Sequence, residues 1–174
     1  GAAGAAPYWV KLARSGNTVT AYQSANGTTW TQIGSPVTIS MATSVYVGLA
    51  LTSHNSGLLS TATFDNVSMS VGSTGTGSLP SPWLNSDIGS VGLAGSAGYT
   101  NGSYTLKGAG ADIWGTTDAF RFAYQPLNGN GTIVARVASL AGTDTWAKGG
   151  VMIRESLDAN ARHAMVVVSS GNGV

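Results

Sequence analysis

The chain has 174 residues, a formal net charge of +1 and 9% charged residues, against a usual level of about 25%. No cluster of Lys and Arg is present, so we expect no nucleic-acid partner, because such binding needs a basic surface. Cysteine is absent, which excludes disulfides and thiolate metal sites. No apolar run approaches the roughly 20 residues of a membrane span, so no membrane insertion is expected.

Residues 1–71 contain short runs rich in Val, Thr, Tyr, Trp and Ile, which favour β-strands. In chain order the runs are YWVKLAR (8–14), TVTAYQS (18–24), TTWTQIG (28–34), VTISM (37–41), VYVGLALT (45–52) and LLSTATFDNVSMS (58–70). The sequence Asn26-Gly27 predicts a hairpin after the second run, because Asn-Gly tolerates the positive φ of tight turns.

Residues 82–174 show the same character and add clean alternation of apolar and polar side chains. The runs are SYTLKG (103–108), AFRFAYQP (119–126), GTIVARVAS (131–139), GGVMIRES (149–156) and RHAMVVVSS (162–170). Phe120, Phe122 and Tyr124 fall on one face of their run, as the period of a strand requires. Residues 156–162 are expected to form a loop. The whole chain is predicted to be all-β, with about eleven to thirteen strands.

Residues 72–81, GSTGTGSLPS, have the composition of a linker between the two parts. Two small independent all-β domains are one alternative, but such pieces have difficulty burying enough surface without disulfides or metals. We therefore predict one two-sheet antiparallel β-sandwich that is assembled from residues 1–71 and 82–174 together. In this prediction Phe64–Met69 is a closing strand, and it lies near an opening strand at Trp83–Gly92.

Two sets of motifs resemble one known family. Residues 82–174, with ADIWGTTDAF and WAKGGVMIRES, resemble the amino-terminal half of a concanavalin A-like (laminin-G-like jelly-roll) module. Residues 7–69, with YWVKLARSGNTVTAYQSANGTTW, VYVGLALTSHN and ATFDNVSM, resemble its carboxy-terminal half. The resemblance covers nearly the whole chain. It implies a concanavalin-like jelly roll of the kind that recurs in large secreted bacterial proteins, and hence an extracellular or cell-surface location.

The order of the two halves differs from that family, in which a further strand and a Ser/Thr/Gly-rich loop also separate them. Three explanations stay open: a cut out of register from a tandem array, a circular permutation, or a fibre repeat completed by its neighbour. The last follows because an incomplete sheet exposes N–H and C=O groups that invite a strand from another chain.

The resemblance and the composition together favour a non-catalytic module that binds a glycan or mediates adhesion. The alternative is a structural subunit of an extracellular filament, whose partners are neighbouring copies of itself. Glu155 is the single Glu, and no two Asp residues stand two apart on a strand, as a paired-carboxylate glycosidase of this fold would need. No G-x-S-x-G motif is present, and His54 and His163 are isolated, so no enzyme is expected.

Glycan recognition needs aromatic faces with hydrogen-bonding groups nearby, and the chain offers both. The candidates are Trp9, Tyr22, Trp30, Trp114, Trp146, Arg121, Arg136 and Arg154. The three arginines lie on the less apolar faces of their strands and would make a polar groove if those faces formed the concave sheet. The alternative for each Trp is ordinary packing in the core or at its rim.

Calcium is a possible cofactor, because modules of this type often bind it and Ca²⁺ prefers carboxylate and carbonyl oxygens. The candidate ligands are Asp65, Asp87, Asp112 and Asp118. Asp65 and Asp87 flank the linker, and Asp112 and Asp118 bracket a Trp-Gly turn. The alternative is turn capping through bonds from the side chain to the backbone.

Overall fold

The computed structural model describes residues 5–69 and 79–174, so residues 72–78 of the expected linker lie outside the described residues. In these two ranges there is no helix long and apolar enough to cross a membrane. They form twelve strands: β1 (Tyr8–Ser15), β2 (Thr18–Ser24), β3 (Thr31–Thr38), β4 (Ser44–Thr52), β5 (Asn55–Met69), β6 (Leu84–Ile88), β7 (Ser96–Thr100), β8 (Ser103–Gly110), β9 (Phe120–Asn128), β10 (Gly131–Ala141), β11 (Lys148–Arg154) and β12 (His163–Ser169).

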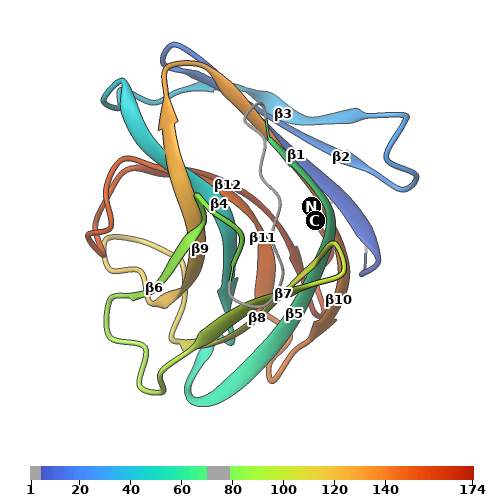
Figure 1. Ribbon diagram of the computed structural model, residues 1–174, viewed down its shortest axis with the longest axis vertical. Helices are drawn as coiled ribbons and strands as arrows, with labels where there is room; N and C mark the ends of the chain where they lie inside the picture. Colours follow the sequence, from blue (N-terminus) through green and yellow to red (C-terminus); the bar gives the residue numbers. More distant parts are fainter. Residues whose placement is uncertain (1–4, 70–78) are drawn as a thin grey trace.

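The strands form two antiparallel sheets that pack face to face as a β-sandwich, which confirms the predicted fold class (Figure 1). The seven-stranded sheet has the order β3-β2-β1-β10-β5-β8-β7, and the five-stranded sheet has the order β12-β11-β4-β9-β6. The two sheets therefore differ by two strands, and β2 and β3 extend the larger one at one side.

Strands from the two parts of the chain alternate within both sheets. In the seven-stranded sheet β10 lies between β1 and β5, and Val10 is paired with Ala135. In the five-stranded sheet β4 lies between β11 and β9, and Leu49 is paired with Val151. Each sheet contains strands from both parts, so the strands before and after the expected linker build one sandwich together.

The strands that flank residues 70–78 lie in opposite sheets. β5 belongs to the seven-stranded sheet and β6 to the five-stranded sheet. Trp83, just before β6, has its ring centroid 4.9 Å from that of Tyr104, which is paired with Phe64 of β5. Burial, with Tyr99 close by, raises the pKa of Tyr104 to about 12. Trp83, at the start of the five-stranded sheet, thus packs against β8 of the seven-stranded sheet, the strand that pairs with β5.

The main core lies between the two sheets and is built from the inward side chains of both parts of the chain. Fully or nearly fully buried members include Val10, Leu12, Val47, Leu49, Leu51, Phe64, Ile133, Ala135, Val137, Val151 and Ile153. Phe64 of β5 packs on Gly149 of β11, where an added Cβ would lie 3.3 Å from the ring. Burying each large side chain contributes about 1.5–3 kcal/mol, so strands 85 residues apart stabilise each other through such contacts.

A second apolar cluster covers the other face of the five-stranded sheet. Its buried members are Ala50, Ile88, Ile113, Phe120, Phe122, Tyr124 and Met152. The predicted alternation of β9 is confirmed, because Phe120, Phe122 and Tyr124 lie in this cluster while Ala123 lies in the main core. Loop residues such as Ile113 and Leu157 close the cluster, so this sheet is covered on both faces.

Candidate functional site

Three connections meet at one end of the sandwich: β4 to β5, β8 to β9, and β10 to β11. The strand register brings them together, because Thr52 is paired with Lys148 and Asn55 with Gly110. They surround a pocket of about 280 Å³, which we call the end pocket. It is lined by His54, Asp112, Trp114, Trp146 and Lys148.

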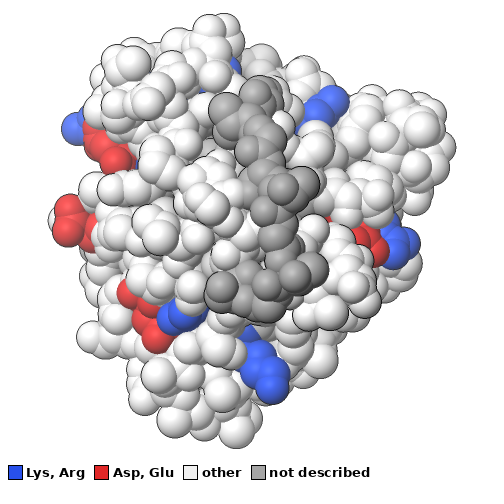
Figure 2. Space-filling view, viewed as in Figure 1, with Lys and Arg blue, Asp and Glu red and all other residues white. Residues whose placement is uncertain are grey.

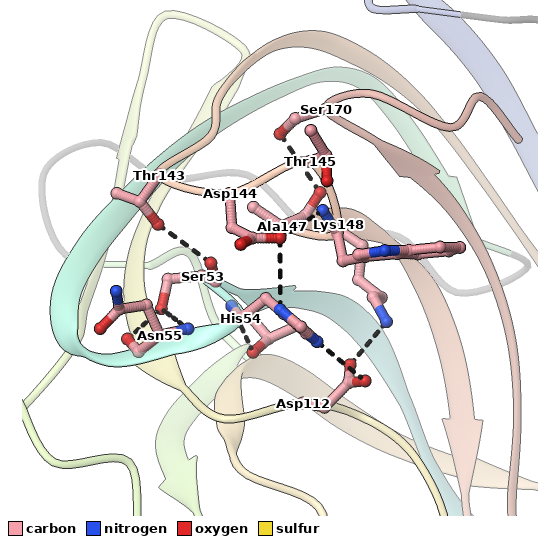
Figure 3. A network of polar contacts seen from close by, with 12 residues as sticks. Ser53, His54, Asn55, Asp112, Thr143, Asp144, Thr145, Ala147, Lys148 and Ser170 are labelled. Carbon is pink, nitrogen blue, oxygen red and sulfur yellow. Dashed lines mark hydrogen bonds and ion pairs between the residues drawn. The ribbon is translucent and has the colours of Figure 1, made fainter.

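A chain of charged and polar contacts crosses the end pocket (Figure 3). Asp112 Oδ1 accepts a hydrogen bond from Lys148 Nζ at 2.5 Å, and Asp112 Oδ2 lies 3.5 Å from His54 Nε2. The other ring nitrogen of His54, Nδ1, lies 3.2 Å from Asp144 Oδ1. His54 therefore bridges two carboxylates, and Lys148 supplies a fixed positive charge to one of them.

His54 stands in a left-handed backbone conformation, with a φ of 55° that non-glycine residues rarely adopt. The residues on both sides hold the turn: Ser53 Oγ donates to the carbonyl of Asn55 at 2.5 Å and accepts from its N–H at 3.1 Å. Thr143 Oγ1 donates to the carbonyl of Ser53 at 2.9 Å, which ties this turn to the β10–β11 loop (Figure 3). The imidazole is thus fixed in direction.

The β8–β9 loop displays Trp114 by burying the residue before it. Ile113 is fully buried in the second apolar cluster, and its N–H donates to Asp112 Oδ1 at 2.7 Å. The N–H of Ala119 donates to the carbonyl of Asp112 at 2.7 Å and closes the loop. Trp114 is then 77% exposed, so packing anchors the loop while leaving the indole free for contact.

The β10–β11 loop displays Trp146 in a similar way. Asp144 Oδ1 accepts the N–H of Trp146 at 2.7 Å, which forms a tight turn, and Ala147 next to it is fully buried. The turn after β12 braces the loop, because Ser170 Oγ donates to the carbonyl of Ala147 at 3.2 Å. Trp146 is 52% exposed, with Lys148 Nζ 5.9 Å from its ring centroid.

The end pocket thus combines two exposed indole rings with fixed hydrogen-bond donors and acceptors. Aromatic rings offer flat apolar faces, while Asp112, Asp144, His54 and Lys148 offer groups that can bind hydroxyls. Small polar ligands are held by this combination of apolar surface and a few well-placed polar groups.

Comparison of the chain with protein-family models, curated proteins and solved structures finds no match.

The other aromatic candidates gather elsewhere, on the seven-stranded sheet. Lys11 Nζ lies 4.2 Å from the ring centroid of Tyr22 and 4.3 Å from that of Trp30. Trp9 lies against the predicted Asn-Gly turn, where a Cβ on Gly27 would be 2.6 Å from its ring. Trp9, Tyr22 and Trp30 are all half-buried, so packing and the Lys11 cation already occupy much of their surface.

The three candidate arginines do not share one open face. Arg154 is fully buried: its Nη1 donates to Asp118 Oδ2 at 3.0 Å, and its guanidinium carbon lies 5.2 Å from the Phe120 ring centroid. Burial lowers the pKa of Arg154, and Asp118 opposes that shift. The expectation for Arg154 as a glycan ligand is therefore corrected, because loops cover this face of the five-stranded sheet. Arg121 is 9% exposed and forms an ion pair with Asp87 at 3.2 Å.

Arg136 is the candidate arginine with the most exposed side chain, and it is engaged by Asp65. Its Nε and Nη2 donate to the two oxygens of Asp65 at 2.7 and 2.6 Å, a bidentate pair. These hydrogen bonds lower the pKa of Asp65, against the opposing effect of burial.

This pair predicts a pH dependence of stability. The lowered pKa of Asp65 in the folded state contributes stability above roughly pH 4, and this contribution is lost as the pH falls through the folded pKa. Asp65→Asn should therefore lower the unfolding temperature slightly at pH 7 and leave it equal to that of the wild type near pH 2. Thermal unfolding of both proteins across that range checks this, and an unchanged difference at all pH values would contradict it.

The four candidate calcium ligands do not come together. Asp65 binds Arg136, Asp87 pairs with Arg121, Asp112 with Lys148, and Asp118 with Arg154. Asp65 and Asp87 lie on strands of different sheets. Within residues 5–69 and 79–174, no group of three or more His, Cys, Asp or Glu is arranged to hold a metal ion. Each carboxylate instead has a cationic side chain as its partner.

The sequence singles out Trp114, Trp146 and Asp112 as separate candidates, and the structure brings them into one site. Asp144 and Lys148 are not among the sequence-based candidates, and His54, expected to be isolated, lies between two carboxylates. One signal was available: Asp144 stands two residues before Trp146, and an Asp in that position often caps a tight turn. The union of the three loops depends on strand register, which no local pattern reveals.

Proposed function

We propose that the protein is a non-catalytic, extracellular or cell-surface module that binds a glycan, and that the end pocket is the binding site. The observation that carries the proposal is the exposure of Trp114 and Trp146 beside the contacts of His54, Asp112 and Lys148. Large aromatic side chains are rarely left in water without a partner, so two in one pocket favour a ligand.

The chemistry of the pocket fits a neutral sugar. An indole face can cover the C–H face of a pyranose ring, and the carboxylates and Lys148 can bind its hydroxyls. Both carboxylates of the pocket already have partners: Asp112 accepts from Lys148 at 2.5 Å, and Asp144 Oδ1 lies 3.2 Å from His54 Nδ1 and accepts the N–H of Trp146. This pairing favours binding over cleavage, because a glycosidase needs one carboxyl group that is free to act as an acid.

A glycan array followed by titration calorimetry tests this proposal. Trp114→Ala and Trp146→Ala should each weaken binding by about tenfold, because each removes an aromatic contact worth on the order of 1 kcal/mol beyond its buried area. Trp30→Ala is the matched control, since it removes a Trp outside the end pocket, and it should bind as the wild type does. Absence of any bound glycan, or equal loss in all three variants, would contradict the proposal.

A further inference from the structure

His54 contacts both of the loops that display the exposed tryptophans. Its Nε2 lies 3.5 Å from Asp112 Oδ2, on the β8–β9 loop that carries Trp114. Its Nδ1 lies 3.2 Å from Asp144 Oδ1, on the β10–β11 loop that carries Trp146. The ring stands between the two carboxylates, so it links the two loops across the end pocket (Figure 3).

The two contacts together require a proton on each ring nitrogen. A neutral imidazole has one N–H and one bare nitrogen with a lone pair, whereas the imidazolium form donates from both nitrogens. The oxygens of Asp112 and Asp144 that face the ring are acceptors when these carboxyl groups are ionised. In the neutral form, one of the contacts therefore brings two lone pairs together, and only the imidazolium form satisfies both.

The charges around the ring lead to the same conclusion. In the described part of the chain, the charged groups beside it are Asp112 on the β8–β9 loop, Asp144 on the β10–β11 loop, and Lys148 of β11, which contacts Asp112. Two carboxylates and one ammonium leave a net charge of −1, which the imidazolium cancels. Figure 2 shows few charged side chains on the face in view, with acidic and basic groups mostly side by side. A balanced cluster fits that distribution.

We propose that His54 is a positioning residue for ligand binding, and that its imidazolium form holds the loops of Trp114 and Trp146 in the arrangement that the ligand needs. Binding is then coupled to the uptake of one proton by His54. Histidine ordinarily changes its charge between about pH 5 and pH 8, so the affinity rises as the pH falls through that range. Because the same pocket is involved, this role of His54 rests on the proposed function.

Calorimetric titration at pH 5.5 and pH 8, with the tightest-binding oligosaccharide of the glycan array, measures the coupling. The wild type should bind about fivefold more tightly at pH 5.5, because one charged contact to a partly exposed carboxylate is gained. His163→Gln is the matched control. His163 is the other histidine of the chain, and its Nδ1 lies 3.4 Å from Asp118 Oδ2, away from the end pocket. This variant should keep the pH profile of the wild type.

Two replacements of His54 separate its charge from its place in the turn. Asn adopts the left-handed backbone as readily as His, so His54→Asn keeps the φ of 55° but has no charge to gain. It should bind weakly at both pH values. His54→Arg has a positive charge at every pH and several N–H donors. It should bind at pH 8 about as tightly as the wild type binds at pH 5.5.

Asp144→Asn tests the same contact from the carboxylate side. The amide keeps an oxygen for the N–H of Trp146, which Asp144 accepts at 2.7 Å. It also gains an NH2 group that can donate to the bare nitrogen of a neutral imidazole. Both protonation states of His54 then satisfy their neighbours, so the affinity should lose most of its dependence on pH.

Amide hydrogen exchange tests the role of His54 without any ligand. After correction for the intrinsic effect of pH, residues 111–118 and 142–147 should exchange more slowly at pH 5.5 than at pH 8 in the wild type. The difference should disappear in His54→Asn and remain in His163→Gln, because only His54 links these two loops.

Three results would overturn the role of His54: equal affinity of the wild type at the two pH values, a wild-type pH profile in His54→Asn, or loop exchange that is the same in the wild type and in His54→Asn. Absence of glycan binding at both pH values has a different meaning. Together with loop exchange that depends on His54, it would overturn glycan binding and leave His54 as the group that holds the two loops.

Discussion

Replacing Arg154 with alanine should lower the free energy of unfolding by about 3–5 kcal/mol, because it removes the arginine partner of the buried Asp118 carboxylate and leaves His163 Nδ1, at 3.4 Å, as the remaining contact. Arg154 is fully buried, and Asp118 beside it is 1% exposed. The guanidinium also donates to the carbonyls of Ser156 and Asp158, at 2.8 and 2.5 Å, so it holds the loop after β11 in place. That loop closes the second apolar cluster, and its loss would expose Phe120.

Denaturant unfolding measures this effect, with Arg136→Ala as the control. Arg136 makes the same kind of ion pair, but on the surface, where solvent screens the charges, so its midpoint should move little. A double replacement, Arg154→Met with Asp118→Leu, should recover much of the stability, because it removes both charges from the interior. If Arg154→Ala and Arg136→Ala unfolded at the same denaturant concentration, the buried pair would not have the role assigned to it.

Much of the fold was predictable because local patterns agreed with the final structure. The run at Thr18–Ser24 became β2 with the same bounds, and Gly27 in the predicted turn has a φ of 76°. One strand was missed: β7 (Ser96–Thr100) has little Val or Ile. Its signal was the Asn101-Gly102 pair, whose φ values of 49° and 85° form a two-residue hairpin with β8.

The site was less predictable, because its parts come from three loops that only sheet register brings together. Exposure of Trp114 depends on burial of Ile113, and a sequence cannot say which of two adjacent apolar residues points inward. Arg154 was expected to be accessible and is buried instead. The alternation of side chains assigns it to the less apolar face of its strand, but loops cover that face, so its guanidinium is inside the protein and cannot contact a ligand. Alternation separates the two faces of a strand without telling which of them meets solvent.

Phe64→Ala should lower the free energy of unfolding by about 3–5 kcal/mol, as for other fully buried Phe side chains. Phe64 belongs to the part of the chain before the expected linker, and it packs on Gly149 from the part after it. The cavity that the substitution leaves therefore weakens the packing between the two sheets. It also weakens the packing between residues 1–71 and residues 82–174. Leu84→Ala is the control: its side chain is 55% exposed, so the change should stay within about 0.5 kcal/mol.

The same experiment tests whether the two parts fold as a unit. Because β10 lies between β1 and β5, and β4 between β11 and β9, unfolding of one part removes these strand pairings from the other and uncovers the core that the two sheets share. Tryptophan fluorescence and far-UV circular dichroism should therefore report one coincident transition, in the wild type and in Phe64→Ala alike. Two separate transitions, with only one shifted by the substitution, would mean that residues 1–71 and 82–174 are independent folding units. A single transition that shifts as a whole would instead mean that the interleaved strands make the two parts unfold together.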